Sequence, residues 1–344
     1  MKLACKLRVS LLVWMMVMVS ILSACNSSGQ GEKETSVQPV KTEDKQKEPE
    51  KPKAYQPVTI QNYHREITFE EVPKRVVSLN QHTTEIMLAL GLENYIVGTA
   101  YNSDGEYLPE LKEKFSKIPV LAEKYPSLEV LLGINPDFVY GRESAFSGKE
   151  ALAAVDDLAK YGIKAYVAKG TYVTAAKMED VYEDILNLGR IFNIEQKAQA
   201  LVQSMQKDIQ EIKNKVGKVE KPIRVLVFDS GEDTVFTAGQ SLQTSLIAMA
   251  GGKNVFDDIE KNWAKVSWEE VVKRDPEVIV INDYGKTSAD EKIKLLLNNP
   301  AMADVKAIKN KSFVVLPLSS VFEGVRNVSA LETLAKGFYP EKFK

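Results

Sequence analysis

The strongest constraint on the fold is an alternation of strand and helix signals that stops once near the middle of the chain and then resumes. Before the break, short apolar or β-branched runs predict strands at residues 75–79, 95–99, 137–140 and 165–167, with helices at 83–90, 127–133 and 150–161. After it, strands are predicted at 224–228, 234–237, 278–282 and 312–316, with helices at 241–250, 267–274 and 328–336. Nearly continuous apolar strands that alternate with helices are typical of parallel sheets. Each half is therefore predicted to be an α/β lobe.

The break itself has a helical pattern. Between residues 175 and 216 apolar side chains recur at helical spacing, from Val181 and Ile185 through to Ile209 and Ile212. Gly189 and Asn193 interrupt the pattern without a proline, so the segment is predicted to be one long helix or two abutting helices. The predicted fold class is α/β, with two Rossmann-like lobes, residues 57–174 and 219–344, joined by a single long helical segment, residues 175–218.

A short motif occurs once in each half. Ser127-Leu128-Glu129-Val130-Leu131 leads to Pro136-Asp137-Phe138-Val139 in the first half. Ser267-Trp268-Glu269-Glu270-Val271 leads to Asp275-Pro276-Glu277-Val278-Ile279 in the second half. Each predicts a short helix with a serine cap, followed by a buried strand. The repeat predicts that the two lobes have a similar fold.

The first 56 residues differ in composition from the rest. A basic start precedes an apolar run that ends in Leu22-Ser23-Ala24-Cys25, and the run is shorter than the roughly 20 residues that span a bilayer. This layout resembles the lipobox of bacterial lipoproteins, which implies removal of residues 1–24 and lipidation of Cys25. An uncleaved anchor helix is the alternative. Residues 25–56 are polar and rich in charged residues, so we predict a disordered tether.

The composition argues against several classes of protein and of functional site. Cys5 and Cys25 are the two cysteines, so the body has no thiol nucleophile, disulfide or cysteine metal site. Lys and Arg (45) nearly balance Asp and Glu (47), which gives no reason to expect nucleic acid as a partner. The two histidines, His64 and His82, are too few for a site for a free metal ion. No phosphate loop, nucleophile elbow or zinc-protease helix is found, so we expect no enzyme and no catalytic residues.

Four segments, taken in order, resemble the class III periplasmic-binding proteins, which are substrate-binding lipoproteins of ABC importers. They are residues 73–79 with 84–91, the 127–139 unit, Gly251-Gly252-Lys253-Asn254-Val255-Phe256, and Trp263 with residues 267–281. The resemblance implies a monomer, anchored on the extracytoplasmic face of the membrane, that delivers an iron–siderophore-type chelate to an ABC permease. A corrinoid such as cobalamin, or haem, is the alternative cargo, and no resident cofactor or metal is implied. A tethered enzyme or adhesion module is the remaining alternative.

Ligands of open α/β sheets bind beyond the carboxyl ends of the strands, so the loops that follow the strands should carry the site. The predicted ligand-binding residues in these loops are His82, Tyr101, Arg142, Phe146, Tyr172, Trp263, Tyr284 and Arg326. Arginine can hold carboxylate or catecholate oxygens, and aromatic rings supply flat apolar walls, which suits an anionic, partly aromatic chelate.

Each of these assignments has a simpler alternative. Arg142 and Arg326 could pair with Glu143 and Glu323 on the surface. Tyr101 and Trp263 could be packing residues, and His82 could hydrogen-bond the backbone.

Two glutamates of the repeated motif have a different implied role. By the resemblance, Glu129 and Glu269 each contact arginines of the permease. The alternative is a first-turn carboxylate that interacts favourably with the helix dipole. Glu270 competes with Glu269, because it stands where a capping box places its acid.

Overall fold

The computed structural model describes residues 54–102 and 107–344. The predicted leader, Cys25 and almost all of the predicted tether lie outside these residues. From Lys53 onwards the chain forms one compact unit. Across the two described ranges, no helix is both long and apolar enough to cross a membrane.

Five parallel strands form the sheet of the first lobe, in the order β5-β4-β3-β6-β7. They are β3 (Val76–Leu79), β4 (Ile96–Ala100), β5 (Val120–Ala122), β6 (Phe138–Gly141) and β7 (Lys164–Val167). Every residue of β3 and β6 is buried, as expected for central strands covered on both faces. Four of the five strands were predicted. The three-residue β5 was not, because Val120 is exposed and the strand has no buried apolar run.

Helices cover both faces of this sheet. They are α1 (Gln81–Ala89), α2 (Lys112–Phe115), α3 (Leu128–Gly133) and α4 (Val155–Lys160), with 3-10 turns η1 (Glu93–Tyr95), η2 (Glu143–Ala145) and η3 (Lys169–Thr171). The Ser127 side chain accepts a hydrogen bond from the Val130 N–H, so the predicted serine cap is present. Helix α4 begins later than the predicted residue 150.

An antiparallel hairpin of β1 (Val58–Asn62) and β2 (Arg65–Phe69) precedes the first lobe's sheet. Its two-residue turn places Tyr63 and His64 at positive φ, 49° and 61°. Asn-Gly or Asp-Gly is the usual sequence for such a turn. The hairpin was not predicted, because neither of its two turn residues is a glycine, asparagine or aspartate.

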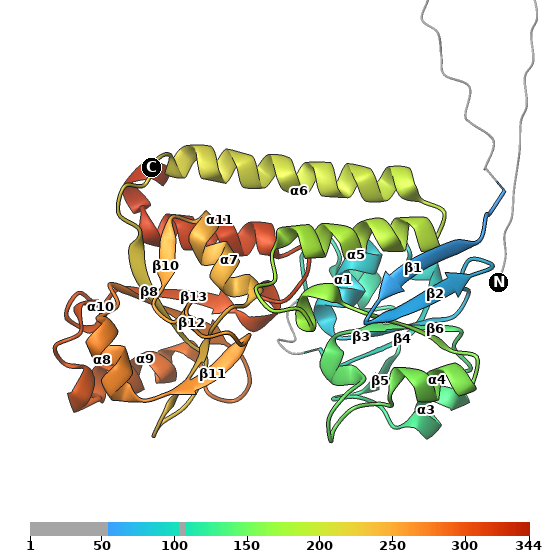
Figure 1. Cartoon of the computed structure of the whole chain (residues 1–344), viewed down its shortest axis with the longest axis horizontal. Helices are drawn as coiled ribbons and strands as arrows, with labels where there is room; N and C mark the ends of the chain where they lie inside the picture. Colours follow the sequence, from blue (N-terminus) through green and yellow to red (C-terminus); the bar gives the residue numbers. More distant parts are fainter. Residues whose placement is uncertain (1–53, 103–106) are drawn as a thin grey trace, which may run out of the picture. The chain divides into compact units, whose positions relative to one another are not determined.

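The linking segment consists of two abutting helices, α5 (Met178–Ile191) and α6 (Glu195–Val216). Asn193, at φ 54°, lies in the turn between them. The helices approach closely at Gly189, where an added Cβ would lie 2.4 Å from the Cβ of Ala198. Helix α6 runs beside α5 and then beside α11 (Asn327–Phe338), so it is in contact with helices of both lobes (Figure 1).

Four parallel strands form the sheet of the second lobe, in the order β10-β8-β12-β13. They are β8 (Ile223–Phe228), β10 (Gly252–Asn254), β12 (Val278–Asp283) and β13 (Phe313–Pro317). The strand predicted at 234–237 is β9 (Val235–Ala238), and it lies outside this parallel sheet. It forms an antiparallel ribbon with β11 (Trp263–Val266), so its assignment to the alternating sheet was wrong.

The helices of the second lobe complete the α/β pattern. They are α7 (Leu242–Met249), α8 (Trp268–Arg274), α9 (Ala289–Asn298), α10 (Lys306–Lys309) and α11, with 3-10 turns η4 (Pro300–Met302), η5 (Leu318–Ser320) and η6 (Pro340–Phe343). Ser267 accepts from the Glu270 N–H, so the second predicted serine cap is present as well. The predicted fold class, two α/β lobes joined by a helical segment, is confirmed.

One hydrophobic core extends through both lobes. It contains Val76 and Phe138 from the first sheet, Val225 and Val280 from the second, and residues of the helices above them, such as Val202 of α6. Separate clusters fill the opposite face of each sheet. The lobes are therefore joined by a continuous apolar layer as well as by the chain.

Polar contacts also join the lobes beneath this layer. The Ala175 N–H donates to the Gln240 carbonyl at 3.0 Å, and the Ser245 hydroxyl donates to the Ala176 carbonyl at 2.7 Å.

Candidate functional site

A cavity of about 500 Å³ lies between the lobes, at the carboxyl ends of both sheets. The first residue after each of five strands lines it: Tyr101 after β4, Arg142 after β6, Asp229 after β8, Tyr284 after β12 and Leu318 after β13. Parallel strands end at the same edge of a sheet, so each sheet brings its own members of this set together. The cavity is within the size range of small-molecule sites.

Flat aromatic side chains form much of the wall. The rings of Trp263 and Phe236 stack at 5.7 Å between centroids, and the Tyr101 ring stacks on Tyr125 at 4.9 Å. The Arg142 guanidinium carbon lies 4.0 Å above the ring of Phe322, which also lines the cavity. The remaining lining residues are Asn102, Glu123, Lys124 and Gly285. Both lobes thus present apolar surfaces to a bound molecule.

Charges of both signs line the cavity. Glu123 and Asp229 are acidic, and Lys124 and Arg142 are basic. Lys124 forms an ion pair with Glu150 at 3.0 Å, so its charge is already partly balanced. The cavity is not strongly positive, and this differs from the expectation that two arginines, Arg142 and Arg326, hold an anionic chelate.

Asp229 is held in a buried polar network. The Tyr284 hydroxyl donates to one carboxylate oxygen at 2.6 Å, and the Asn282 amide donates to the other at 3.2 Å. Burial, and then the hydrogen bond to Asp229, raises the pKa of Tyr284. The Lys292 ammonium donates to the Asp229 carbonyl at 2.7 Å and lies 4.2 Å from the Tyr284 ring centre, and burial lowers the pKa of Lys292. These contacts fix the position of Tyr284 in the cleft.

The structure places four of the eight predicted ligand-binding residues in this cavity: Tyr101, Arg142, Trp263 and Tyr284. The same rule that selected Tyr101 and Arg142, a polar residue directly after a strand, also applies to Asp229, which was not selected. Phe236 had no such signal, because it belongs to the antiparallel ribbon.

Arg326 lies away from the cavity. Its guanidinium makes two hydrogen bonds to the Glu85 carboxylate, at 2.7 and 2.5 Å, and both residues are buried, 7% and 1% exposed. The buried pair with Glu85 places Arg326 outside the cavity that four of the other predicted residues line. The reason is that Arg326 precedes α11 and faces α1 of the other lobe, where Glu85 is the available anion.

Three other predicted residues also lie elsewhere. His82 is buried in the first turn of α1, 5.4 Å between ring centroids from Phe322, and burial, then Arg142, lowers its pKa well below the usual value. Phe146 is 4% exposed and packs in the core beneath the first sheet. The Tyr172 hydroxyl accepts from the Tyr63 N–H at 3.2 Å, against the N-terminal hairpin. These positions follow strands, but Phe146 faces the lobe interior, Tyr172 faces the hairpin and His82 faces Phe322 of the second lobe.

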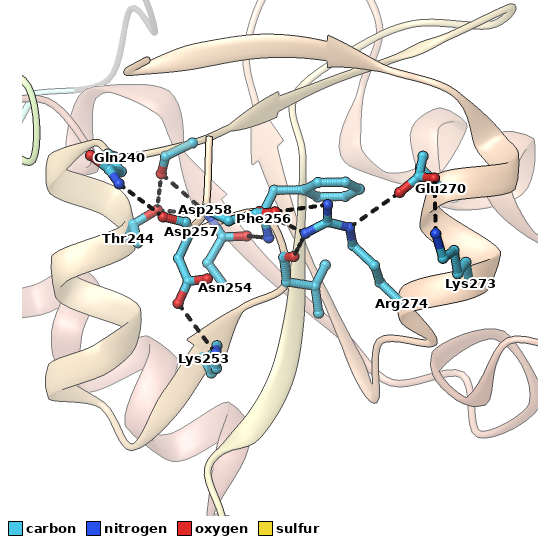
Figure 2. Close-up of polar contacts among 12 residues, drawn as sticks. Gln240, Thr244, Lys253, Asn254, Phe256, Asp257, Asp258, Glu270, Lys273 and Arg274 are labelled. Carbon is cyan, nitrogen blue, oxygen red and sulfur yellow. Dashed lines mark hydrogen bonds and ion pairs between the residues drawn. The ribbon is translucent and has the colours of Figure 1, made fainter. Parts of the chain in front are cut away.

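The glutamates of the repeated motif occupy the first turns of α3 and α8, where Glu129 and Glu269 are exposed. Glu270 is engaged in ion pairs, 3.6 Å from both the Lys273 ammonium and the Arg274 guanidinium. Figure 2 shows Arg274 held between Glu270 and Asp258. No ion pair of Glu129 or Glu269 occurs among residues 54–102 and 107–344. Glu269 is therefore the more available of the two neighbouring acids.

Metal coordination by the protein itself has no support in the described part of the chain, which contains no group of three His, Cys, Asp or Glu side chains that could hold an ion.

Comparison with known proteins identifies close structural counterparts. A family model described as periplasmic binding protein matches residues 76–319. YvrC of Bacillus subtilis (strain 168), an ABC transporter substrate-binding lipoprotein, is 29% identical over 293 residues, which are 84% of this chain and 87% of YvrC. A vitamin B12-binding protein of Yersinia pestis (strain Pestoides F) is 26% identical over 213 residues, 62% of this chain and 70% of that protein.

Two solved structures are similar over most of the chain. A periplasmic binding protein from Veillonella parvula has a TM-score of 0.76 and 33% identity, covering 83% of this chain and 98% of that one. An ABC-type Fe3+-hydroxamate transport protein from Saccharomonospora viridis has a TM-score of 0.72 and 25% identity, covering 83% and 99%.

Proposed function

This chain belongs to the periplasmic binding protein family and is a substrate-binding protein of an ABC transporter, and from this premise we propose that its cargo is a bulky metal chelate of low net charge. The first candidate is an iron–siderophore chelate of the hydroxamate type. The chelate binds in the interlobe cleft and is delivered to the membrane permease without covalent chemistry.

The observation that carries this proposal is the aromatic, charge-balanced cleft. Trp263 and Phe236 offer a flat stacked surface, and Arg142 is the one arginine among the lining residues. A multiply anionic catecholate chelate would be repelled by the carboxylates of Glu123 and Asp229. A ferric trihydroxamate is electrically neutral at its iron centre and avoids this repulsion. The similarity to the Saccharomonospora viridis protein supports the same choice.

A corrinoid is the second candidate. Its flat macrocycle would fit between the Tyr101 and Trp263 walls, and the 26% identity to a vitamin B12-binding protein favours it. Haem has less support, because His82, the histidine considered as an iron ligand, does not line the cleft.

Tryptophan fluorescence tests the proposal directly. Of the three tryptophans, two lie in the body: Trp263 lines the cleft, and Trp268 is buried with its indole N–H on the Glu232 carbonyl at 2.8 Å. Titration of the body from Lys53 with ferrichrome, ferrioxamine B, cyanocobalamin and haemin should give saturable quenching by ferrichrome, ferrioxamine B or cyanocobalamin. Trp263→Phe should remove most of the quenching and retain binding in a calorimeter. If none of these chelates gives saturable quenching, the proposed class of cargo is wrong.

For the permease contact we propose Glu129 and Glu269. Their exposure on equivalent helices of the two lobes supports a shared docking role, and the ion pairs of Glu270 make it the less suitable acid. Glu129→Ala and Glu269→Ala should leave chelate affinity unchanged and slow uptake of labelled chelate by cells, since rim charges mainly affect encounter with the partner. Glu270→Ala is the matched control and should affect uptake less than Glu269→Ala.

For the membrane contact we propose an anchor on Cys25. Its thiol is the single lipidation site suggested by the lipobox pattern. Membrane fractionation should find Cys25→Ala in the soluble fraction or as an unprocessed precursor.

A further inference from the structure

A second cavity, of about 210 Å³, lies beside the cleft and is more enclosed. Arg142, Trp263 and Phe322 line both cavities, so these three side chains form the wall between them. We call the second cavity the rear chamber. Its remaining lining comes from η2 and η3 in the first lobe, and from the start of α7, the residue before β11 and the loop after η5 in the second.

Four of the side chains that line the rear chamber have a buried polar atom without a hydrogen-bond partner in the described part of the chain. These atoms are Arg142 Nε, Ser241 Oγ, Asn262 Oδ1 and Glu323 Oε2. Ser241 and Glu323 are only 7% and 6% exposed. A buried polar atom without a partner costs about 1–3 kcal/mol. Four of them at one small cavity indicate that something else supplies their partners.

The other polar groups at this cavity are already satisfied. The Thr171 hydroxyl donates to the Ala168 carbonyl at 2.6 Å and accepts from the Glu143 N–H at 2.9 Å. The Glu143 carboxylate accepts from the hydroxyls of Tyr63 and Ser147. Ser241 precedes α7, yet its hydroxyl caps no N–H of that helix. The four unpartnered atoms are therefore a distinct subset of the polar groups that line this chamber.

The four atoms define the group that would match them. Glu323 Oε2 and Asn262 Oδ1 accept, Arg142 Nε donates, and the Ser241 hydroxyl can do either. A primary amide carries two N–H donors and one carbonyl acceptor, which complements this set. An anion would meet the carboxylates of Glu323 and Glu143, a donor-only cation would leave the Arg142 N–H without an acceptor, and an apolar group would leave all four atoms unpaired.

We propose that the rear chamber is a second binding site that takes an uncharged arm of the cleft ligand ending in a primary amide. The arm would reach it past Arg142 and Phe322, while the metal-bearing body stays in the larger cleft. This inference rests on the proposed function and narrows it, because the rim of a corrinoid carries primary amides and a simple trihydroxamate such as ferrichrome carries none. The chamber thus favours the corrinoid class.

The test compares two probes and three variants of the body from Lys53. Ser241→Val removes one chamber hydroxyl and fills part of the volume. If this variant does not fold, Asn262→Leu removes the amide acceptor Oδ1 instead. Ser204→Val, on the exposed face of α6, is the matched control. Affinities for cyanocobalamin and ferrichrome are measured by calorimetry, and folding is checked by thermal melting.

The expected result is that cyanocobalamin binds and that Ser241→Val weakens it at least tenfold, with Ser204→Val unchanged. Any ferrichrome affinity should change less than twofold. Unchanged cyanocobalamin affinity in Ser241→Val would show a chamber that holds only water, and an equal loss for both probes would show a general distortion; either overturns the inference. Binding of ferrichrome alone by the wild type also overturns it and leaves the proposed function standing. Binding of neither probe, nor of any other chelate in the screen, is instead the failure of the proposed function.

Discussion

Two arginines that look alike in the sequence have different environments in the molecule. Arg142 follows β6 and lies over Phe322 in the wall of the cleft, whereas Arg326 is buried against Glu85 in the other lobe. Each lies in a loop that follows a strand, and each has a glutamate close by in the sequence. Only the packing of the loop after η5 against α1 distinguishes them, and that is a long-range contact that a local pattern does not carry.

Arg142→Ala should weaken chelate binding by about 1.5–3 kcal/mol, the range for hydrogen bonds to charged groups. The reason is that Arg142 is the cationic donor shared by the cleft and the rear chamber. Calorimetric titration with the chelate identified in the fluorescence screen measures this change in binding free energy. Arg142→Lys should recover only part of the lost affinity. Wild-type affinity in Arg142→Ala would contradict a role in binding.

Arg326→Ala should lower the free energy of unfolding by about 3–5 kcal/mol, because it leaves the Glu85 carboxylate buried without its partner. Urea unfolding is the measurement. The double variant with Glu85→Gln should recover much of the stability, since no unpaired charge remains. A single variant as stable as the wild type would show that the pair contributes nothing.

The raised pKa of Glu323 should make the free energy of unfolding depend on pH. Burial raises its pKa in the folded state, so between its ordinary value, near 4.5, and the raised value the folded chain binds more protons than the unfolded chain. Stability from this group is therefore greatest at low pH and falls as the pH rises through that window. The unfolding free energy of the wild type minus that of Glu323→Gln should decrease from pH 4 to pH 8, and a difference that is constant or increases would contradict the assignment.

At the scale of elements, the strands that were predicted correctly from the sequence are the buried ones. Strands β3, β6, β8 and β12, which are central and buried, were predicted from continuous apolar runs, and both serine caps were predicted from their position. Strands β5, β10 and β11 are short and partly exposed or polar, so hydrophobicity carries no signal for them. The position of the α5–α6 boundary was left open, because Asn193 ends a helix only in the left-handed conformation that it adopts here.

Two helical glycines offer a matched comparison of packing and propensity. Gly189→Ala should destabilise the fold by about 1–3 kcal/mol, because the new Cβ would overlap Ala198 where α5 meets α6. Gly133→Ala, in α3 with nothing within 4 Å of the new Cβ, should stabilise it by about 0.5–1 kcal/mol. Denaturant unfolding of both variants measures the contrast. Equal effects would show that the α5–α6 contact is looser than described.

At the scale of the body from Lys53 onwards, the shared core determines how far the lobes can move. Val202 of α6 belongs to the same apolar cluster as strands of both sheets, and Arg326–Glu85 bridges the lobes below it. The sequence predicted which loops meet at the cleft, since strand ends define them. It did not predict which side chains enter the cavity, because His82, Phe146 and Tyr172 are directed elsewhere by contacts with distant segments.

Ligand binding should therefore change the radius of gyration of the body very little, because hinge closure would have to break this core. Small-angle scattering of the body from Lys53, with and without saturating chelate, measures the change. A decrease comparable to that of hinge-type binding proteins would contradict the shared core as a rigid link.

The last long helix also sets the order in which the chain can mature. Leu331, Leu334 and Phe338 of α11 belong to the same apolar cluster as Val202 of α6, and α11 follows every strand of both sheets in the chain. A ribosome therefore produces α11 after both sheets, and the nascent chain cannot complete its main core before that helix has been made. Until then the chain is incompletely folded, the form in which a chain can be threaded end first through a narrow channel.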